Sequence, residues 1–131
     1  MNEHGFIKSI HSKLSKEVYK WKIHDTYAGG VPDAFYSGPA GILFIEYKYV
    51  PKLPTRLTTN IKCNISELQY QWLHRMYDQG HKVAVVLGAD KEAFIMHYPT
   101  IWKGPISKEY FQDNCVPFKD VAKWIEEQTL P

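Results

Sequence analysis

Hydrophobic residues recur along this chain with two different periods, which separate the expected helices from the expected strands. Helical spacing predicts a first helix over residues 3–15, with one face formed by Glu3, Ile7, Ile10 and Leu14. Alternating or continuously apolar runs predict strands over residues 18–23, 31–36, 42–50, 83–87 and 93–98. Further helices are predicted over about 67–79 and 117–128. The expected order is therefore α-β-β-β-α-β-β-α.

Turn residues and a capping signal mark the boundaries of these elements. The break Ala28-Gly29-Gly30 separates the first two strands, and a turn over 37–41 joins the next two into a hairpin. Ser66 and Gln69 have the spacing of a capping box, so they predict the start of the second helix. Irregular chain is expected in two places, residues 50–64 and 99–116.

The strand over 42–50 is apolar on both of its faces. Ile42 and Phe44 lie on one face, and Leu43 and Ile45 lie on the other. A strand of this kind is typical of the centre of a sheet that is covered on both sides. We therefore expect an α/β (α+β) fold in which helices flank both sides of a mixed central sheet.

Composition limits the classes of protein to consider. The chain has 131 residues, of which 44% are hydrophobic and 23% charged, as expected for one globular domain. Its apolar runs are too short to cross a membrane, and its start has no signal-peptide pattern. The cysteines, Cys63 and Cys115, show no metal-type spacing, and neither do the histidines His4, His11, His24, His74, His81 and His97. We expect reduced thiols and a cytoplasmic location.

Charge is distributed unevenly along the chain. Residues 1–66 carry nine Lys and Arg against five Asp and Glu, whereas residues 67–131 carry seven against nine. Glu46 is the only acid between Asp33 and Glu67, a stretch that also holds Lys48, Lys52, Arg56 and Lys62. Such a stretch is equally consistent with a polyanion-binding surface and with a solvated loop.

Asp33, Glu46 and Lys48 are the residues that predict chemistry. If the strands that hold them pair, the two carboxylates converge at one end of the sheet, where their repulsion favours a cation between them. Oxygen ligands favour Mg²⁺ or Mn²⁺. Lys48 lies on the same strand face as Glu46 and can stabilise negative charge on a phosphate. The combination is typical of phosphodiester hydrolysis. If these residues form no catalytic site, Asp33 is a turn residue, and Glu46 and Lys48 form an exposed ion pair at the end of a strand.

The longer pattern around these residues resembles the PD-(D/E)XK nucleases, and within them the VRR-NUC group. The resemblance rests on four segments: Gly30-Val31-Pro32-Asp33, Phe44-Ile45-Glu46-Tyr47-Lys48, Ile65-Ser66-Glu67-Leu68-Gln69-Tyr70-Gln71-Trp72-Leu73 and Gly80-His81-Lys82-Val83-Ala84-Val85-Val86. The chain resembles especially the small stand-alone versions carried by phages and bacteria, which are related to Holliday-junction resolvases. This implies one nuclease domain over 1–131, with a restriction-endonuclease-like core over about 3–98 and a C-terminal extension.

The resemblance also implies roles for individual residues. Asp33 and Glu46 match the metal ligands of the family, and the carbonyl of Tyr47 matches a usual third ligand. Lys48 matches the catalytic lysine. Gln69 matches a glutamine that reaches the site from the second core helix, beside its capping role. Glu3 matches an acid of the first helix, although it would also suit a helix N-terminus. We expect Trp72 and Trp124 in the core, and Trp102 in a loop.

The expected function is a Mg²⁺- or Mn²⁺-dependent DNA endonuclease that acts on branched DNA as a homodimer. The alternatives are a repair, flap or restriction-type nuclease, and a DNA-binding module on a decayed nuclease fold. The 50–64 loop is longer than the resemblance predicts, and we expect Lys52, Arg56 and Lys62 in it to contact DNA. The dimer surface is expected among apolar residues near the C-terminus, which can equally cover the chain's own core: Tyr98, Ile101, Trp102, Tyr110, Phe111, Phe118, Val121, Trp124 and Ile125.

Overall fold

The computed structural model describes residues 1–23 and 29–131, so His24 and Ala28 of the sequence analysis lie outside the described residues. Its helices are α1 (Glu3–His11), α2 (Glu67–Asp78), α3 (Pro99–Trp102), α4 (Lys108–Asn114) and α5 (Phe118–Thr129). Its strands are β1 (Tyr19–Lys22), β2 (Ala34–Gly38), β3 (Gly41–Val50), β4 (Asn60–Ile61), β5 (Lys82–Ala89), β6 (Glu92–Met96), β7 (Ile106–Ser107) and β8 (Val116–Pro117). No helix of this part of the chain is long and apolar enough to cross a membrane.

A six-stranded sheet in the order β1-β2-β3-β5-β6-β8 forms the centre of the molecule. Only the β3–β5 pair is parallel, and the other pairs are antiparallel, so the sheet is mixed as expected. In the register of β3 with β5, Glu46 is opposite Val85 and Lys48 is opposite Leu87. The central position predicted for the doubly apolar strand is confirmed, because β3 has a partner on each side.

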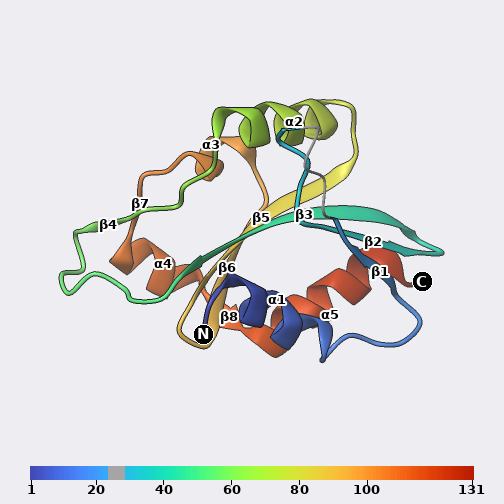
Figure 1. Ribbon diagram of the computed structural model, residues 1–131, viewed down its shortest axis with the longest axis horizontal. Helices are drawn as coiled ribbons and strands as arrows, with labels where there is room; N and C mark the ends of the chain where they lie inside the picture. The colour runs from blue at the N-terminus through green and yellow to red at the C-terminus, as the bar shows by residue number, and fades with distance from the viewer. Residues whose placement is uncertain (24–28) are drawn as a thin grey trace.

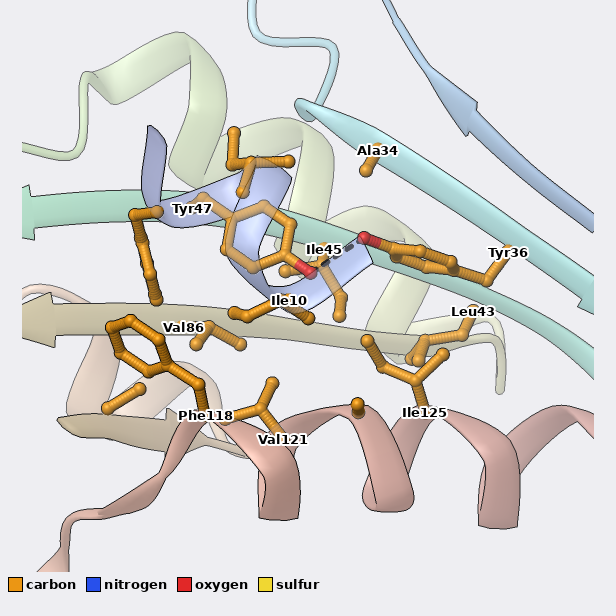
Figure 2. Packing of buried hydrophobic residues seen from close by; sticks show 14 of the residues in the cluster. Ile10, Ala34, Tyr36, Leu43, Ile45, Tyr47, Val86, Phe118, Val121 and Ile125 are labelled. Carbon is orange, nitrogen blue, oxygen red and sulfur yellow. Dashed lines mark hydrogen bonds between the residues drawn. The ribbon is translucent and has the colours of Figure 1, made fainter. Parts of the chain in front are cut away.

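Helices cover both faces of this sheet (Figure 1). Helices α1 and α5 lie on one face, and α2 lies on the other. The core between the sheet, α1 and α5 contains Tyr36, Tyr47, Val121 and Ile125, all of them fully buried (Figure 2). A second core on the α2 side includes Leu73, Val85, Trp102 and Phe111. The predicted fold class, a mixed sheet with helices on both sides, is therefore confirmed.

Helix α1 packs tightly under the central strands because β5 has a glycine where the two meet. A Cβ on Gly88 would lie 2.6 Å from the ring of Phe6, so a larger residue would push the helix away. The Phe6 ring in turn contacts Tyr47 edge-on, with 5.5 Å between ring centroids. Tyr47 lies between Glu46 and Lys48, so α1 supports the strand segment that carries both charges.

Two predicted element boundaries differ from the structure by three residues or more. The first helix ends at His11 rather than at residue 15, because the backbone continues in i→i+3 turns and the Ser12 hydroxyl donates to the carbonyl of Ser9. The strand predicted over 31–36 runs over Ala34–Gly38. Pro32 has no N–H to donate to a neighbouring strand, so regular pairing begins after it.

The C-terminal third is more ordered than the expected irregular chain. It contains α3, α4 and the short strands β7 and β8, and β8 completes one edge of the main sheet. These elements were missed because segments this short show no complete apolar period. Trp102, expected in a loop, is fully buried, and its Nε1 donates to the Met96 carbonyl at 2.8 Å. Trp72 and Trp124 pack against the two cores as expected.

Candidate active site

Strand β3 carries two charged side chains on the sheet face that contacts α2. Glu46 and Lys48 point to the same side because side chains alternate along a strand. Glu46 is only 1% exposed, and its Oε2 lies 3.2 Å from Nζ of Lys48. Lys48 itself is partly exposed, so the pair lies where the core meets the solvent.

Asp33 is fixed to the same strand segment through its carboxylate. Its Oδ2 accepts a 2.9 Å hydrogen bond from the backbone N–H of Tyr47. The turn before it passes very close to α2, since a Cβ on Gly30 would lie 2.3 Å from the carbonyl oxygen of Leu68. The φ of Gly30 is also +91°, so this position requires glycine on both grounds. The close approach joins Asp33, β3 and the first turn of α2.

Gln69 connects the first turn of α2 to Glu46. Its Nε2 donates to Oε2 of Glu46 at 2.8 Å, and its Oε1 accepts from the backbone N–H of Ser66 at 3.0 Å. Ser66 reciprocates by accepting from the N–H of Gln69, which completes the predicted capping box. The side chain therefore both caps the helix and contacts the buried carboxylate, and helix formation itself orients its amide.

The Glu46 carboxylate is held in an environment that disfavours its charge. Burial, and then the nearby Asp33 carboxylate, raise the pKa of Glu46 to about 8, against the opposing effect of Lys48. Its Oε1 is buried and has no hydrogen-bond partner among the described residues. A buried acceptor without a donor is costly, so this atom marks a position where a ligand would be stabilising.

Glu3 lies near this group without hydrogen-bonding to it. Partial desolvation, and then repulsion from Asp33, raise the pKa of the Glu3 carboxyl, whereas Lys48 and Lys22 lower it. Glu3 in turn raises the pKa of Glu46. The first helix thus brings an exposed acid within electrostatic range of both carboxylates, on the side of the site that faces α1.

The oxygen donors of the site suit a hard divalent cation. Asp33 and Glu46 supply carboxylates from the β2 and β3 region, and the unpartnered Oε1 of Glu46 is an acceptor that a cation would satisfy. Within residues 1–23 and 29–131, no group of three or more His, Cys, Asp and Glu side chains is placed to hold a metal. Bound metal would therefore depend on two carboxylates, completed by backbone or water oxygens.

A buried hydrogen-bond chain supports the other face of the same strand segment. The hydroxyl of Tyr47 lies 2.6 Å from that of Tyr36, which lies 2.7 Å from Nε2 of His11 (the tyrosine pair is drawn in Figure 2). Burial raises the pKa of both hydroxyls, so both stay protonated. The sequence analysis missed this chain because Tyr36 and His11 are remote in sequence and carry no local signal.

The three predicted DNA-binding residues of the long loop, Lys52, Arg56 and Lys62, are all exposed. The loop is tied to the C-terminal region, because β4 pairs with β7 and the N–H groups of Lys108 and Glu109 donate to loop carbonyls. The structure also brings Cys63 near the site, although its sequence context gave no hint. Burial raises the pKa of the Cys63 thiol to about 11, with smaller effects from Lys48 and Glu46. The Cys63 thiol is therefore within electrostatic range of the two charged side chains of β3.

Comparison with known proteins identifies the fold. No protein-family model and no curated protein matches the sequence. Among solved structures, the chain is similar to Hjc of Archaeoglobus fulgidus, described as a Holliday junction resolvase from an archaeal hyperthermophile. The TM-score is 0.57 at 14% sequence identity, and the match covers 94% of this chain and 97% of that one. The chain thus has the restriction-endonuclease-like fold of that resolvase over nearly its whole length.

Proposed function

We propose that this chain is a divalent-metal-dependent DNA endonuclease, with Asp33, Glu46 and Lys48 at its catalytic centre. The observation that supports this most directly is the environment of Glu46. Its carboxylate is buried beside Asp33 and Lys48 and has one oxygen without a partner among the described residues. A purely structural carboxylate would be expected to have both oxygens satisfied, so the arrangement favours a binding role.

Asp33 and Glu46, with the backbone carbonyl of Tyr47, are the groups that would hold Mg²⁺ or Mn²⁺. Glu3, the tentative ligand of the sequence analysis, is not grouped with the two carboxylates among the described residues, so it would act on the site through its charge. When bound, such a cation supplies Lewis acidity, which activates water and stabilises charge on a phosphate. Asp33 is held for this role by the Tyr47 N–H, and Gln69 orients the carboxylate of Glu46. Gln69 therefore acts as a positioning residue for Glu46.

Lys48 provides the fixed positive charge of the reaction. Its Nζ lies 3.2 Å from Glu46 and is partly open to solvent, so it can contact a phosphate that approaches the strand end. An ammonium at this position stabilises the additional negative charge that develops on the phosphate as the phosphodiester is hydrolysed. Its pairing with Glu46 keeps the long side chain in place before the substrate binds.

The substrate class that we propose is branched DNA, cut by a homodimer. The support is the similarity in fold to Hjc, which is described as a Holliday junction resolvase. The exposed Lys52, Arg56 and Lys62 of the long loop would add contacts to phosphates. Two copies related by a two-fold axis would give two active sites for the two symmetric cuts of a junction.

A substrate panel tests this function. End-labelled linear duplex, single strand, flap and four-way junction are incubated with Mg²⁺, Mn²⁺, Ca²⁺ or EDTA. We expect cleavage with Mg²⁺ and Mn²⁺, most rapidly of the junction, and binding without cleavage with Ca²⁺. Asp33→Asn should abolish cleavage, whereas Asp113→Asn, at an exposed acid of α4, should not.

Each other result has a defined meaning. Full activity in excess EDTA would refute a metal mechanism. If a flap or a linear duplex is cleaved faster than the junction, the enzyme is a repair, flap or restriction-type nuclease and is not selective for junctions. DNA binding without cleavage in any metal would indicate a non-catalytic module on a nuclease fold.

A further inference from the structure

A row of aromatic side chains runs across the sheet from α2 to its outer edge. Trp72 of α2 contacts Phe44 of β3, which contacts Phe35 of β2, with ring centroids 5.2 and 5.4 Å apart. Phe35 then contacts Trp21 and Tyr19 of β1, at 6.3 and 6.2 Å. The strand register explains the row, because Trp21 is opposite Phe35 and Phe35 is opposite Phe44.

The outer end of this row is open to solvent. Tyr19 is 61% exposed and Trp21 is 56% exposed, whereas the inner end at Phe44 packs against the core on the α2 side. The exposed rings also contact the row behind them, so they form one contiguous apolar surface, and a contiguous surface of this kind marks a binding site more often than single exposed residues do. We call the surface formed by Tyr19, Trp21 and Phe35 the aromatic face of the β1–β2 edge.

The aromatic face leads directly to the candidate active site. Phe44 and Glu46 are two residues apart on the same face of β3, and the N–H of Ile23, just after β1, donates to the carbonyl of Asp33 at 2.7 Å. From strand spacing, Trp21 and Glu46 are about 12 Å apart, two strands across and two residues along. A nucleic acid chain with its scissile phosphate at Lys48 would therefore bring neighbouring bases over Trp21.

The charges of β1 favour a polyanion rather than a second copy of the chain. Lys20 and Lys22 alternate with Tyr19 and Trp21, so they point to the opposite face, where they line a basic cavity of about 370 Å³ with His4, Lys8 and His11. Pairing of two β1 edges would bring the lysines of both copies together on one face, which is repulsive. A DNA strand would instead meet aromatic rings on one side of the edge and positive charge on the other.

We propose that the aromatic face binds unpaired bases of the DNA substrate, which stack on Trp21 and Tyr19 while Lys20 and Lys22 attract the phosphate backbone. This inference rests on the proposed nuclease function for its substrate, and it adds that DNA with unpaired bases beside the cut is preferred. Stacking suits such a site because every base has an aromatic face and no base sequence is required.

The test is binding of a labelled oligodeoxythymidine and of a blunt duplex, measured by fluorescence anisotropy in EDTA so that cleavage does not interfere. Trp21→Ala should weaken single-strand binding about tenfold, since stacking contributes roughly 1–3 kcal/mol per base. Trp21→Phe should retain most of the affinity, and duplex binding should change far less. Tyr77→Ala is the control, because Tyr77 is also a solvent-exposed aromatic residue, at 38%, but lies in the last turn of α2 and contacts Trp102 of α3.

Equal single-strand affinity of wild type and Trp21→Ala would overturn the proposal, as would an equal loss of affinity in Tyr77→Ala. Sedimentation gives a further check: a wild-type dimer that becomes monomeric in Trp21→Ala would identify the occupant as a second copy and also overturn it. If single-strand binding depends on Trp21 but no substrate is cleaved, the proposed nuclease function fails and the binding of unpaired bases at the aromatic face stands. If cleavage is normal but single-strand binding does not depend on Trp21, this inference fails and the proposed nuclease function stands.

Discussion

At the residue scale, the candidate site is organised around a carboxylate that the fold keeps away from water. Glu46 has Lys48 and Gln69 on one oxygen and no described partner on the other. Burial and Asp33 raise its pKa to about 8, which means that the surrounding protein disfavours its ionised form. Under the proposed function, a bound cation would offset the cost of burying this carboxylate.

The first prediction concerns the three central residues. Asp33→Asn, Glu46→Gln and Lys48→Ala should each lower the cleavage rate at least about 100-fold, because each removes a charge that the reaction uses. The rate is measured on labelled junction DNA with Mg²⁺. Matched controls are Asp113→Asn, Glu127→Gln and Lys123→Ala, which change the same residue types at exposed positions of α4 and α5.

Thermal unfolding separates loss of chemistry from loss of fold in these variants. Glu46→Gln should melt no lower than the wild type in EDTA, because it replaces a buried carboxylate by a neutral amide of the same shape. Near-wild-type cleavage by any of the three variants would remove that residue from the proposed centre.

At the element scale, α1, β2 and β3 are joined by the His11–Tyr36–Tyr47 chain. Burial, and then the positive charges of Lys20 and Lys22, lower the pKa of His11 from 6.5 to about 4. A histidine of the unfolded chain takes up a proton near pH 6.5, whereas the folded chain resists it. The stabilising contribution of neutral His11 is therefore complete above pH 6.5 and is lost as the pH falls toward about 4.

The second prediction follows from this direction. His11→Gln should be less stable than the wild type at pH 7.5, and the difference in melting temperature should shrink at pH 5, because the glutamine has no proton to take up. Thermal melts across this pH range measure the effect. His81→Gln, at an exposed histidine, should keep the wild-type pH profile. A difference in melting temperature between wild type and His11→Gln that does not change with pH would contradict this role of neutral His11.

The third prediction concerns the long loop as an element. Replacing Lys52, Arg56 and Lys62 together by alanine should weaken DNA binding on all sequences alike. It should also lower the slope of log affinity against log salt by about 0.9 for each lost phosphate contact on duplex DNA. A matched triple variant, Lys91→Ala with Lys119→Ala and Lys123→Ala, removes the same charge from exposed lysines elsewhere. If both triple variants behave alike, the loop is a solvated insertion.

At the scale of the whole molecule, the proposed dimer has fewer candidate surfaces than the sequence suggested. Trp102, Phe111, Phe118, Val121 and Ile125 are buried in the cores of their own chain, so they are not free to form an interface. Tyr98 and Tyr110 remain exposed. Most of these apolar residues cover the chain's own core, which was the other role considered for them.

The fourth prediction is that the chain nonetheless sediments as a dimer of 15.3 kDa protomers at micromolar concentration, or becomes one on junction DNA. A stable interface needs roughly 800 Å² from each copy, more than Tyr98 and Tyr110 supply, so surface outside the C-terminal region must contribute. A monomer both alone and with junction DNA bound would defeat the dimer, and with it the support for symmetric junction cutting.

Much of the fold followed from the sequence because the signals involved are local. Alternation along residues 42–50 determined that Glu46 and Lys48 share a strand face, and the Ser66–Gln69 spacing determined where α2 begins. The break at Gly29 and Gly30, just before Asp33, was likewise recognisable from residue type, because glycine adopts backbone conformations that other residues avoid. The fold class came from the same periodicities.

The tertiary structure alone decided which of these groups meet and how deeply they are buried. The high pKa of Glu46, the His11–Tyr36–Tyr47 chain and the approach of Cys63 all depend on packing between residues remote in sequence. The same holds for the short C-terminal elements and for the solvent-exposed end of the aromatic row at β1. Burial and electrostatic environment are properties of the assembled core, because they depend on the neighbours that long-range pairing brings together, and no local period in the sequence encodes them.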